Sequence, residues 1–128
     1  MIFNVFRFIT ATAMDSAAIQ DMFRFISCDG PTLLTQLCRF PFFFFLNDEG
    51  KLSLFPTLIA VTFENEENLS VMAESIDMQH IGKWLHKRIH GIRVEKRHRR
   101  PLEQRDLLFV QKVPPRHWAR CLELYCKE

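Results

Sequence analysis

Eight basic residues gather in one stretch of the chain and give the sequence its clearest chemical signal. They are Lys83, Lys87, Arg88, Arg93, Lys96, Arg97, Arg99 and Arg100. Lysine and arginine neutralise the phosphates of nucleic-acid backbones, and the resulting affinity falls steeply as salt rises. Trp84 is the only Phe, Tyr or Trp in this stretch, so base stacking and sequence readout are not supported. The stretch predicts contacts with an RNA backbone, although an acidic protein or an anionic membrane surface would suit it equally.

The charges of the whole chain are divided in the same way. Up to Gly82 there are four basic residues against ten acidic ones, and from Lys83 onward thirteen against five. Such an asymmetry favours an anionic partner for the C-terminal part. The alternative is that these charges only keep a helix face and a loop in solution.

No combination of residues predicts catalysis. A nucleophile needs a base within reach and an orienting group, yet no motif links the four cysteines to the five histidines. The sequence also has no Gly-rich phosphate loop. We therefore expect neither an enzyme nor a small-molecule substrate, and no cofactor.

A metal site is the other chemistry to weigh. His86 and His90 stand one helical turn apart, a spacing that can place two imidazoles on one ion. Lys83 and Lys87 fall on the same helix face, and their charge would oppose a cation. We expect two histidines on a basic surface and no metal ligands.

The cysteines and the apolar segments exclude two further classes. Cys28, Cys38, Cys121 and Cys126 occupy mostly apolar helical positions, which is typical of reduced buried thiols rather than of a disulfide scaffold. No apolar segment approaches the ~20 residues that span a bilayer, so membrane insertion is not expected.

The hydrophobic pattern predicts an all-α protein. No segment shows sustained period-two alternation, and apolar residues recur at helical spacing between Gly, Pro and Asn breaks. Six to eight short helices, arranged as stacked helical pairs, fit this spacing of breaks. Ser16 (or Asp15), Asn47 (or Asp48) and Asn65 are the expected helix caps.

The expected organisation has three parts. Residues 1–92 form a helical-repeat core, residues 93–101 a basic exposed loop, and residues 102–128 C-terminal capping helices. Within the core, residues 40–46 form a Phe-rich corner, which we expect to be a buried joint between two helices. The helix of residues 2–13 starts without a capping signal, so the chain is expected to be a fragment of a longer protein.

Several blocks of the chain are similar to one known family. They are the Gly-Pro-Thr-Leu-Leu-Thr-Gln-Leu-Cys of residues 30–38, Pro41-Phe42 with Phe44-Phe45, the Leu-Phe-Pro-Thr-Leu-Ile-Ala of residues 54–60, and Val113-Pro114 with Trp118. In this order they resemble the C-terminal end of the family of the S-phase cyclin A-associated protein in the endoplasmic reticulum.

The resemblance implies an armadillo-like helical-repeat (α-solenoid) fragment with an adaptor or scaffold function. Members are linked to cyclin A and the cell cycle, and to ribosome-associated decay of tubulin messenger RNA. It implies protein partners, ribosome association and a cytoplasmic location at the cytosolic face of the endoplasmic reticulum. The family's zinc-finger and cyclin-binding portions are not present in this sequence, so those activities are not transferred.

A second hypothesis keeps the fold and drops the RNA contact. The chain would then be a purely structural terminal cap of a larger α-solenoid that binds an acidic protein partner. Its basic residues would only maintain solubility.

Overall fold

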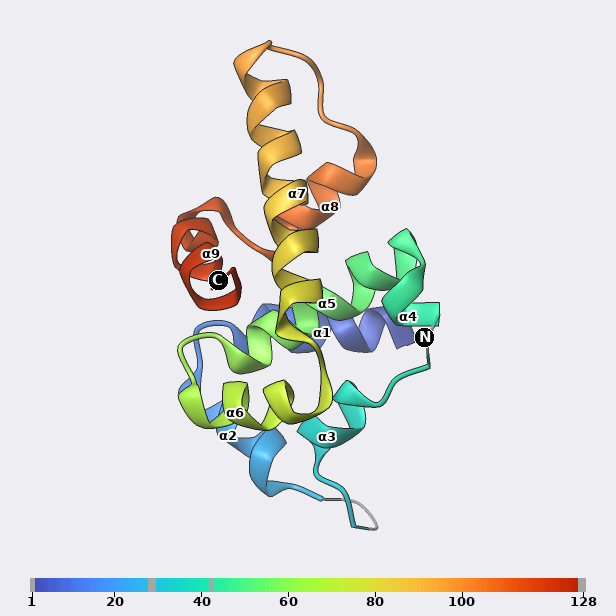
Figure 1. The fold of residues 1–128 in the computed structure, drawn as a ribbon, viewed down its shortest axis with the longest axis vertical. Coiled ribbons are helices and arrows are strands. Elements are labelled where there is room, and N and C mark those ends of the chain that lie inside the picture. Colours follow the sequence, from blue (N-terminus) through green and yellow to red (C-terminus); the bar gives the residue numbers. More distant parts are fainter. Residues whose placement is uncertain (1, 28–29, 42, 127–128) are drawn as a thin grey trace. The chain divides into compact units, whose positions relative to one another are not determined.

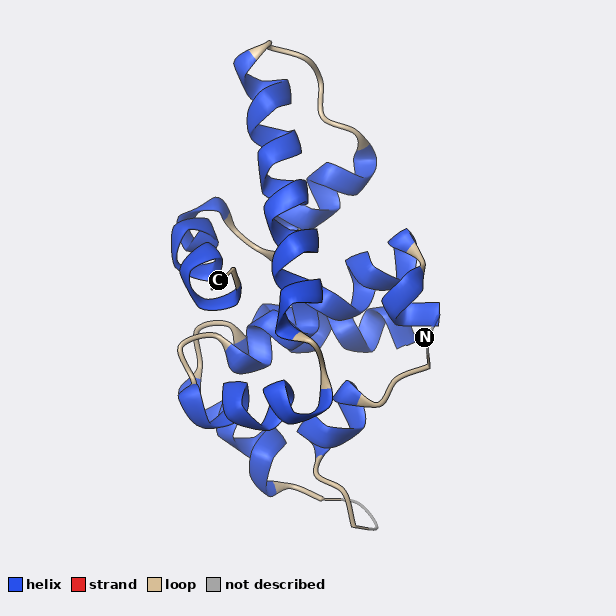
Figure 2. Ribbon diagram, in the orientation of Figure 1, coloured by secondary structure: helices blue, strands red, loops and turns tan. Residues whose placement is uncertain are grey.

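The computed structural model describes residues 2–27, 30–41 and 43–126, with side chains from residue 5 onward. Cys28, Phe42 and Lys127 lie outside the described residues. Within these ranges the chain forms nine α-helices, one 3-10 helix and no strand (Figures 1 and 2). The helices are α1 (Ile2–Ala13), α2 (Ala17–Phe25), α3 (Leu33–Cys38), α4 (Phe43–Leu46), α5 (Asp48–Thr62), α6 (Glu66–Ser75), α7 (Met78–Arg97), α8 (Gln104–Lys112) and α9 (Trp118–Tyr125), with the 3-10 helix η1 at Pro115–His117.

The predicted all-α class is confirmed, and so are three helix starts, but the described residues form nine α-helices instead of the expected six to eight. Ser16, Asn47 and Asn65 each accept a hydrogen bond from backbone N–H groups of the following turn. The armadillo-like arrangement stays a prediction. The chain divides into two compact units, residues 1–77 and 78–128. The boundary that we expected at residue 92 falls inside α7.

Helix α5 is the centre of the first unit. It packs against α1, α2, α3, α4 and α6, and every residue from Leu52 to Thr62 is buried. A helix that is buried all round needs apolar residues on every side, and α5 has them. Its buried hydroxyls are satisfied locally: Thr57 Oγ1 bonds Thr10 Oγ1 at 2.9 Å and donates to the Phe6 carbonyl at 3.2 Å.

The C-terminal end of α5 is stabilised by amide side chains from two neighbouring helices. The last carbonyl groups of a helix have no partner within it. Here Gln20 Nε2 of α2 donates to the carbonyls of Ala60 (3.0 Å) and Phe63 (2.8 Å). Asn68 Nδ2 of α6 donates to the carbonyls of Val61 (2.7 Å) and Gln20 (2.8 Å). Both amides are buried, so this network joins α2, α5 and α6.

The prediction of a buried Phe-rich corner is wrong for part of the corner. Phe43 is 49% exposed and Leu46 is 74% exposed. Helix α4 has only one turn, so it can direct only one side toward its neighbours. That side carries Phe44 and Phe45, whose rings lie 5.9 Å from Phe6 and 6.0 Å from Phe55.

The second unit has an aromatic core. The Phe109 ring of α8 lies 5.5 Å from Trp84 of α7 and 5.9 Å from Trp118 of α9. Trp118 Nε1 donates to the Val113 carbonyl at 2.7 Å, which satisfies the buried indole. These three rings connect α7, α8 and α9.

The prediction of a loop at residues 93–101 is wrong for its first half, because α7 continues to Arg97. Buried Ile92 holds the helix to the core up to that point. Beyond it, Glu, Lys and Arg are good helix formers, and Lys96 and Arg97 interact favourably with the negative end of the helix dipole. Only the residues between α7 and α8 form a loop.

We predict that Asn68→Ala lowers the free energy of unfolding by about 2–4 kcal/mol, because two buried carbonyls lose their donors. Urea unfolding followed by circular dichroism measures this. Ser70→Ala, at an exposed position of the same helix, is the control and should change stability by less than about 0.5 kcal/mol. Equal effects of the two substitutions would contradict the structural role of Asn68.

Candidate functional site

Helix α7 presents one exposed side that is rich in basic residues. With 20 residues it is about 30 Å long. Ile81, Trp84, Leu85, Ile89 and Ile92 are buried. The opposite side carries five exposed residues, which we call the basic face: Lys83, His86, Lys87, His90 and Arg93.

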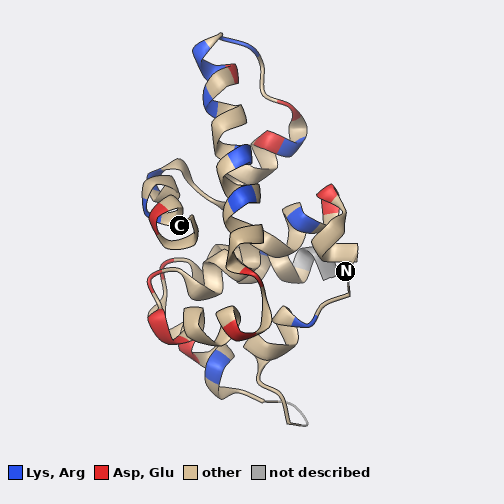
Figure 3. Ribbon diagram, viewed as in Figure 1, with Lys and Arg blue, Asp and Glu red and all other residues tan. Residues whose placement is uncertain are grey.

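The basic face lacks acidic residues. Glu95 is the only Asp or Glu between Met78 and Arg97, and it is half-buried, 3.5 Å from Arg100. Within the described part of the chain, Lys83 and Lys87 form no ion pair. Figure 3 shows the resulting row of basic residues along α7. Their charges are therefore available to a partner.

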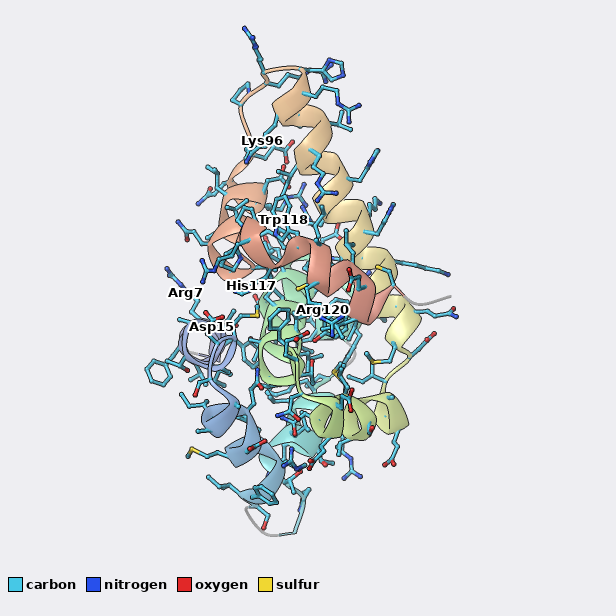
Figure 4. The ribbon with its side chains drawn as sticks, turned by 90° about the vertical axis from the view of Figure 1, so that its left-hand side faces the viewer. Arg7, Asp15, Lys96, His117, Trp118 and Arg120 are labelled. Carbon is cyan, nitrogen blue, oxygen red and sulfur yellow. The ribbon has the colours of Figure 1, made fainter. Side chains whose placement is uncertain are left out.

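The basic residues continue at the C-terminal end of α7. We call Lys96, Arg97, His98, Arg99 and Arg100 the tip, and all five are exposed. Within unit 2 the last turn of α7 and the loop that follows project away from α8 and α9 (Figure 1). Lys96 lies nearer to this end than Trp118 does (Figure 4). The tip is therefore accessible to a large ligand.

Arg88 and Arg93 already have partners in the fold. The Arg88 side chain is 17% exposed, pairs with Asp106 at 3.3 Å, and lies over the Trp84 ring at 5.9 Å. The Arg93 guanidinium lies over the Trp118 ring at 5.8 Å. Arg88 thus holds α7 to α8 and is the least available of the eight predicted contact residues. The other seven, Arg93 included, lie on the basic face or the tip.

Trp84 is buried, so it offers no stacking surface for a base. No other Phe, Tyr or Trp lies on the basic face or the tip. Large apolar side chains are also missing from both surfaces, since Val94 is only half-exposed and Ile92 is buried. The arrangement can neutralise negative charge but offers no aromatic surface for stacking on bases and no apolar anchor for a protein partner.

His86 and His90 lie side by side on the basic face. Their rings are parallel within 4°, with centroids 6.2 Å apart. The described residues contain no group of three or more His, Cys, Asp or Glu side chains that could hold a metal ion. Both histidines are exposed and belong to the basic face.

The described cysteines are not joined in disulfides. Cys38 and Cys121 are buried, and Cys126 is half-buried, with its Sγ 3.2 Å from the Gly82 carbonyl. Burial raises the pKa of Cys38 to about 11 and also raises the pKa of Cys126. At neutral pH these two groups are thiols rather than thiolates, so they are not activated nucleophiles.

Sequence analysis found the basic residues and placed Lys83, His86, Lys87 and His90 on one helix face. Trp84, the single aromatic residue of the basic stretch, belongs to the core. Nothing in the sequence signalled the pairing of Arg88 with Asp106, which are 18 residues apart. The structure adds Arg93 to this face, because α7 continues through residues 93–97.

Comparisons of the chain with protein-family models, with curated proteins and with solved structures give no match. The family resemblance therefore stays a prediction. Among the described residues, no helix combines the length and the apolar character needed to cross a membrane.

Two glycines of α7 test how this helix is held. A Cβ at Gly82 would collide with the Tyr125 carbonyl of α9, whereas a Cβ at Gly91 would meet nothing within 4 Å. We expect Gly82→Ala to destabilise the protein by about 1–3 kcal/mol through overpacking. Gly91→Ala should stabilise it by about 0.5–1 kcal/mol, because alanine is the better helix former. Chemical denaturation measures the free energy of unfolding of both variants. Changes of the same sign in the two variants would refute the packing of α7 against α9.

Proposed function

We propose that this chain is a non-catalytic binding module whose basic face and tip contact the phosphate backbone of RNA. The observation that carries the proposal is an exposed helix side with Lys and Arg and without a single acidic residue. Each cation on such a side can replace a counterion at a phosphate, which yields affinity that depends on salt but not on sequence.

The composition of this surface favours nucleic acid over a protein partner. Protein interfaces depend on a few buried aromatic or apolar anchors, surrounded by a polar rim. The basic face and the tip have no exposed Phe, Tyr, Trp, Leu, Ile or Met. Protein–DNA interfaces are much more positively charged and more polar than protein–protein interfaces, and phosphate contacts to RNA have the same chemistry. An acidic protein remains a second outcome of the test.

The wider role that we propose is that of an adaptor or scaffold. The resemblance supports an armadillo-like repeat fragment that docks on ribosomes in the cytoplasm, including the cytosolic face of the endoplasmic reticulum. The all-α fold is compatible with this role. Protein partners would then bind elsewhere than the basic face.

We predict that the double substitution Lys83→Glu/Lys87→Glu weakens binding to a 20-base-pair RNA duplex at least about tenfold in 100 mM salt, because two attractive charges become repulsive. Fluorescence anisotropy with a labelled duplex measures the affinity, and ribosome co-sedimentation extends the test to the proposed target.

The control makes the same change in charge at another place. Arg7→Glu/Arg39→Glu alters two exposed arginines of the first unit, and Arg7 projects from α1 (Figure 4). This control should retain affinity within about threefold, since neither arginine belongs to the basic face or the tip. Equal losses in the two double variants would show a general charge effect and would remove the basic face from the proposal.

One observation favours the alternative function, a terminal structural cap. Phe8 is 70% exposed and Val5 is 49% exposed on the outer side of α1. Exposed apolar residues on one helix side favour packing against another helix. The cap would use this side of α1 to join a solenoid and would need no RNA contact.

If the cap function holds, the chain should self-associate through α1, and Phe8→Ser should return it to a monomer without loss of thermal stability. Sedimentation equilibrium between 5 and 200 µM, that is, over an about 40-fold range, measures the mass. A chain that is monomeric and stably folded throughout would argue against the cap.

A further inference from the structure

Helix α7 ends in a Schellman motif that has an arginine where glycine is normally found. The Arg100 N–H donates to the Glu95 carbonyl at 2.9 Å, and the Arg99 N–H donates to the Lys96 carbonyl at 3.1 Å. This pair of bonds defines the motif, and Arg99 occupies its left-handed position, with φ +56°.

A side chain at this position is energetically unfavourable, because its Cβ approaches the backbone carbonyl. Glycine avoids this contact, and asparagine tolerates it better than most residues. Backbone strain of this kind points to a hypothesis of function when it falls on a chemically relevant residue. Among the described non-glycine residues, Glu64 is the other with a positive φ, in the turn between α5 and α6.

The surroundings of Arg99 indicate what its side chain can do. It is exposed, and no acidic side chain pairs with it within the described residues. Arg97 and His98 precede it, and Arg100 follows, all of them exposed. The backbone hydrogen bonds of the Schellman motif fix the path of the chain here, so Arg97 and Arg99 are displayed from an ordered helix end, while Arg100 pairs with Glu95.

We propose that the tip is the principal phosphate contact of the chain and that Arg99 is its central residue, held in the left-handed conformation at a cost in stability. This inference rests on the proposed function and adds to it the residue and the ligand group: one guanidinium at a phosphate of the nucleic-acid backbone. Arginine suits this contact because its planar group can donate two parallel hydrogen bonds to a phosphate.

The test uses three substitutions of Arg99 in the full chain. Arg99→Gly should raise the melting temperature by about 2–6 °C through relief of strain, measured by circular dichroism. The same variant should bind a 20-base-pair RNA duplex about three- to tenfold more weakly at 50 mM salt. The slope of log affinity against log salt should shrink by about one.

The other two substitutions separate charge from backbone. Arg99→Asn removes the charge but tolerates the left-handed conformation, so its binding should match that of Arg99→Gly. Arg99→Lys keeps the charge and the strain, so both its salt slope and its melting temperature should match the unchanged chain. Arg120→Gln, at an exposed arginine that is paired with Glu123 on α9, is the control and should leave the slope unchanged.

Two outcomes overturn the inference at different levels. If the unchanged chain binds the duplex and Arg99→Gly keeps the full salt slope, Arg99 is not a phosphate contact, while the proposed function stands. If the unchanged chain shows no salt-dependent binding to duplex RNA or duplex DNA, the proposed function fails together with the inference. Binding to poly-glutamate alone would then identify an acidic protein as the partner.

Discussion

The fold of the first unit depends on the burial of α5 along most of its length. A helix with apolar residues on all sides gains stability from every neighbour, but its terminal backbone groups must still find hydrogen-bond partners. At the N-terminal end of α5, Asn47 Oδ1 accepts hydrogen bonds from the backbone N–H groups of Glu49 and Gly50. At the other end the partners come from α2 and α6, through Gln20 and Asn68. Burying α5 therefore requires those two helices to be in place.

This requirement makes the polar network cooperative. The Asn68 Oδ1 atom accepts a hydrogen bond from Arg24 Nη1 at 2.8 Å, and Arg24 pairs in turn with Asp21 and Glu67. The network thus runs from buried amides to exposed carboxylates across three helices. A fully satisfied network of this type specifies one arrangement of helices, because any other would leave buried groups without partners.

Sequence reasoning found most of what depends on neighbouring residues. The helix caps Ser16, Asn47 and Asn65 are local signals, and they were correct. Gln20 and Asn68 could not be assigned, because their partners lie about 40 residues away in the chain or on another helix. The continuation of α7 was missed for a different reason: hydrophobic periodicity reports burial, and the last turns of α7 bury almost nothing. The exposed Phe43 shows the converse, since an apolar residue need not be buried when its helix has only one turn.

The two units differ in charge as well as in fold. Residues 1–77 contain the four basic and ten acidic residues of the N-terminal part, a net charge of −6, and the rest of the chain has a net charge of +8. In the second unit the residues that hold the fold together are Trp84, Phe109 and Trp118, with Arg88 paired to Asp106. The residues of the basic face are exposed, and among them Arg93 lies over the Trp118 ring of this core. The side chains of the other four can therefore be replaced at little cost to the fold.

The separation between core residues and exposed charged residues explains why charge patterning was the most informative feature of the sequence. Core residues are constrained by packing and report the fold. Exposed residues on a helix are less constrained by packing, and the reason that we propose for an acid-free basic face is binding rather than stability. At the tip this reason has a structural counterpart, because Arg99 occupies a position where its side chain is disfavoured. A charge that serves only solubility could be placed at an unstrained position on the surface. A residue that contacts a ligand, in contrast, has to stay at the position that the ligand requires.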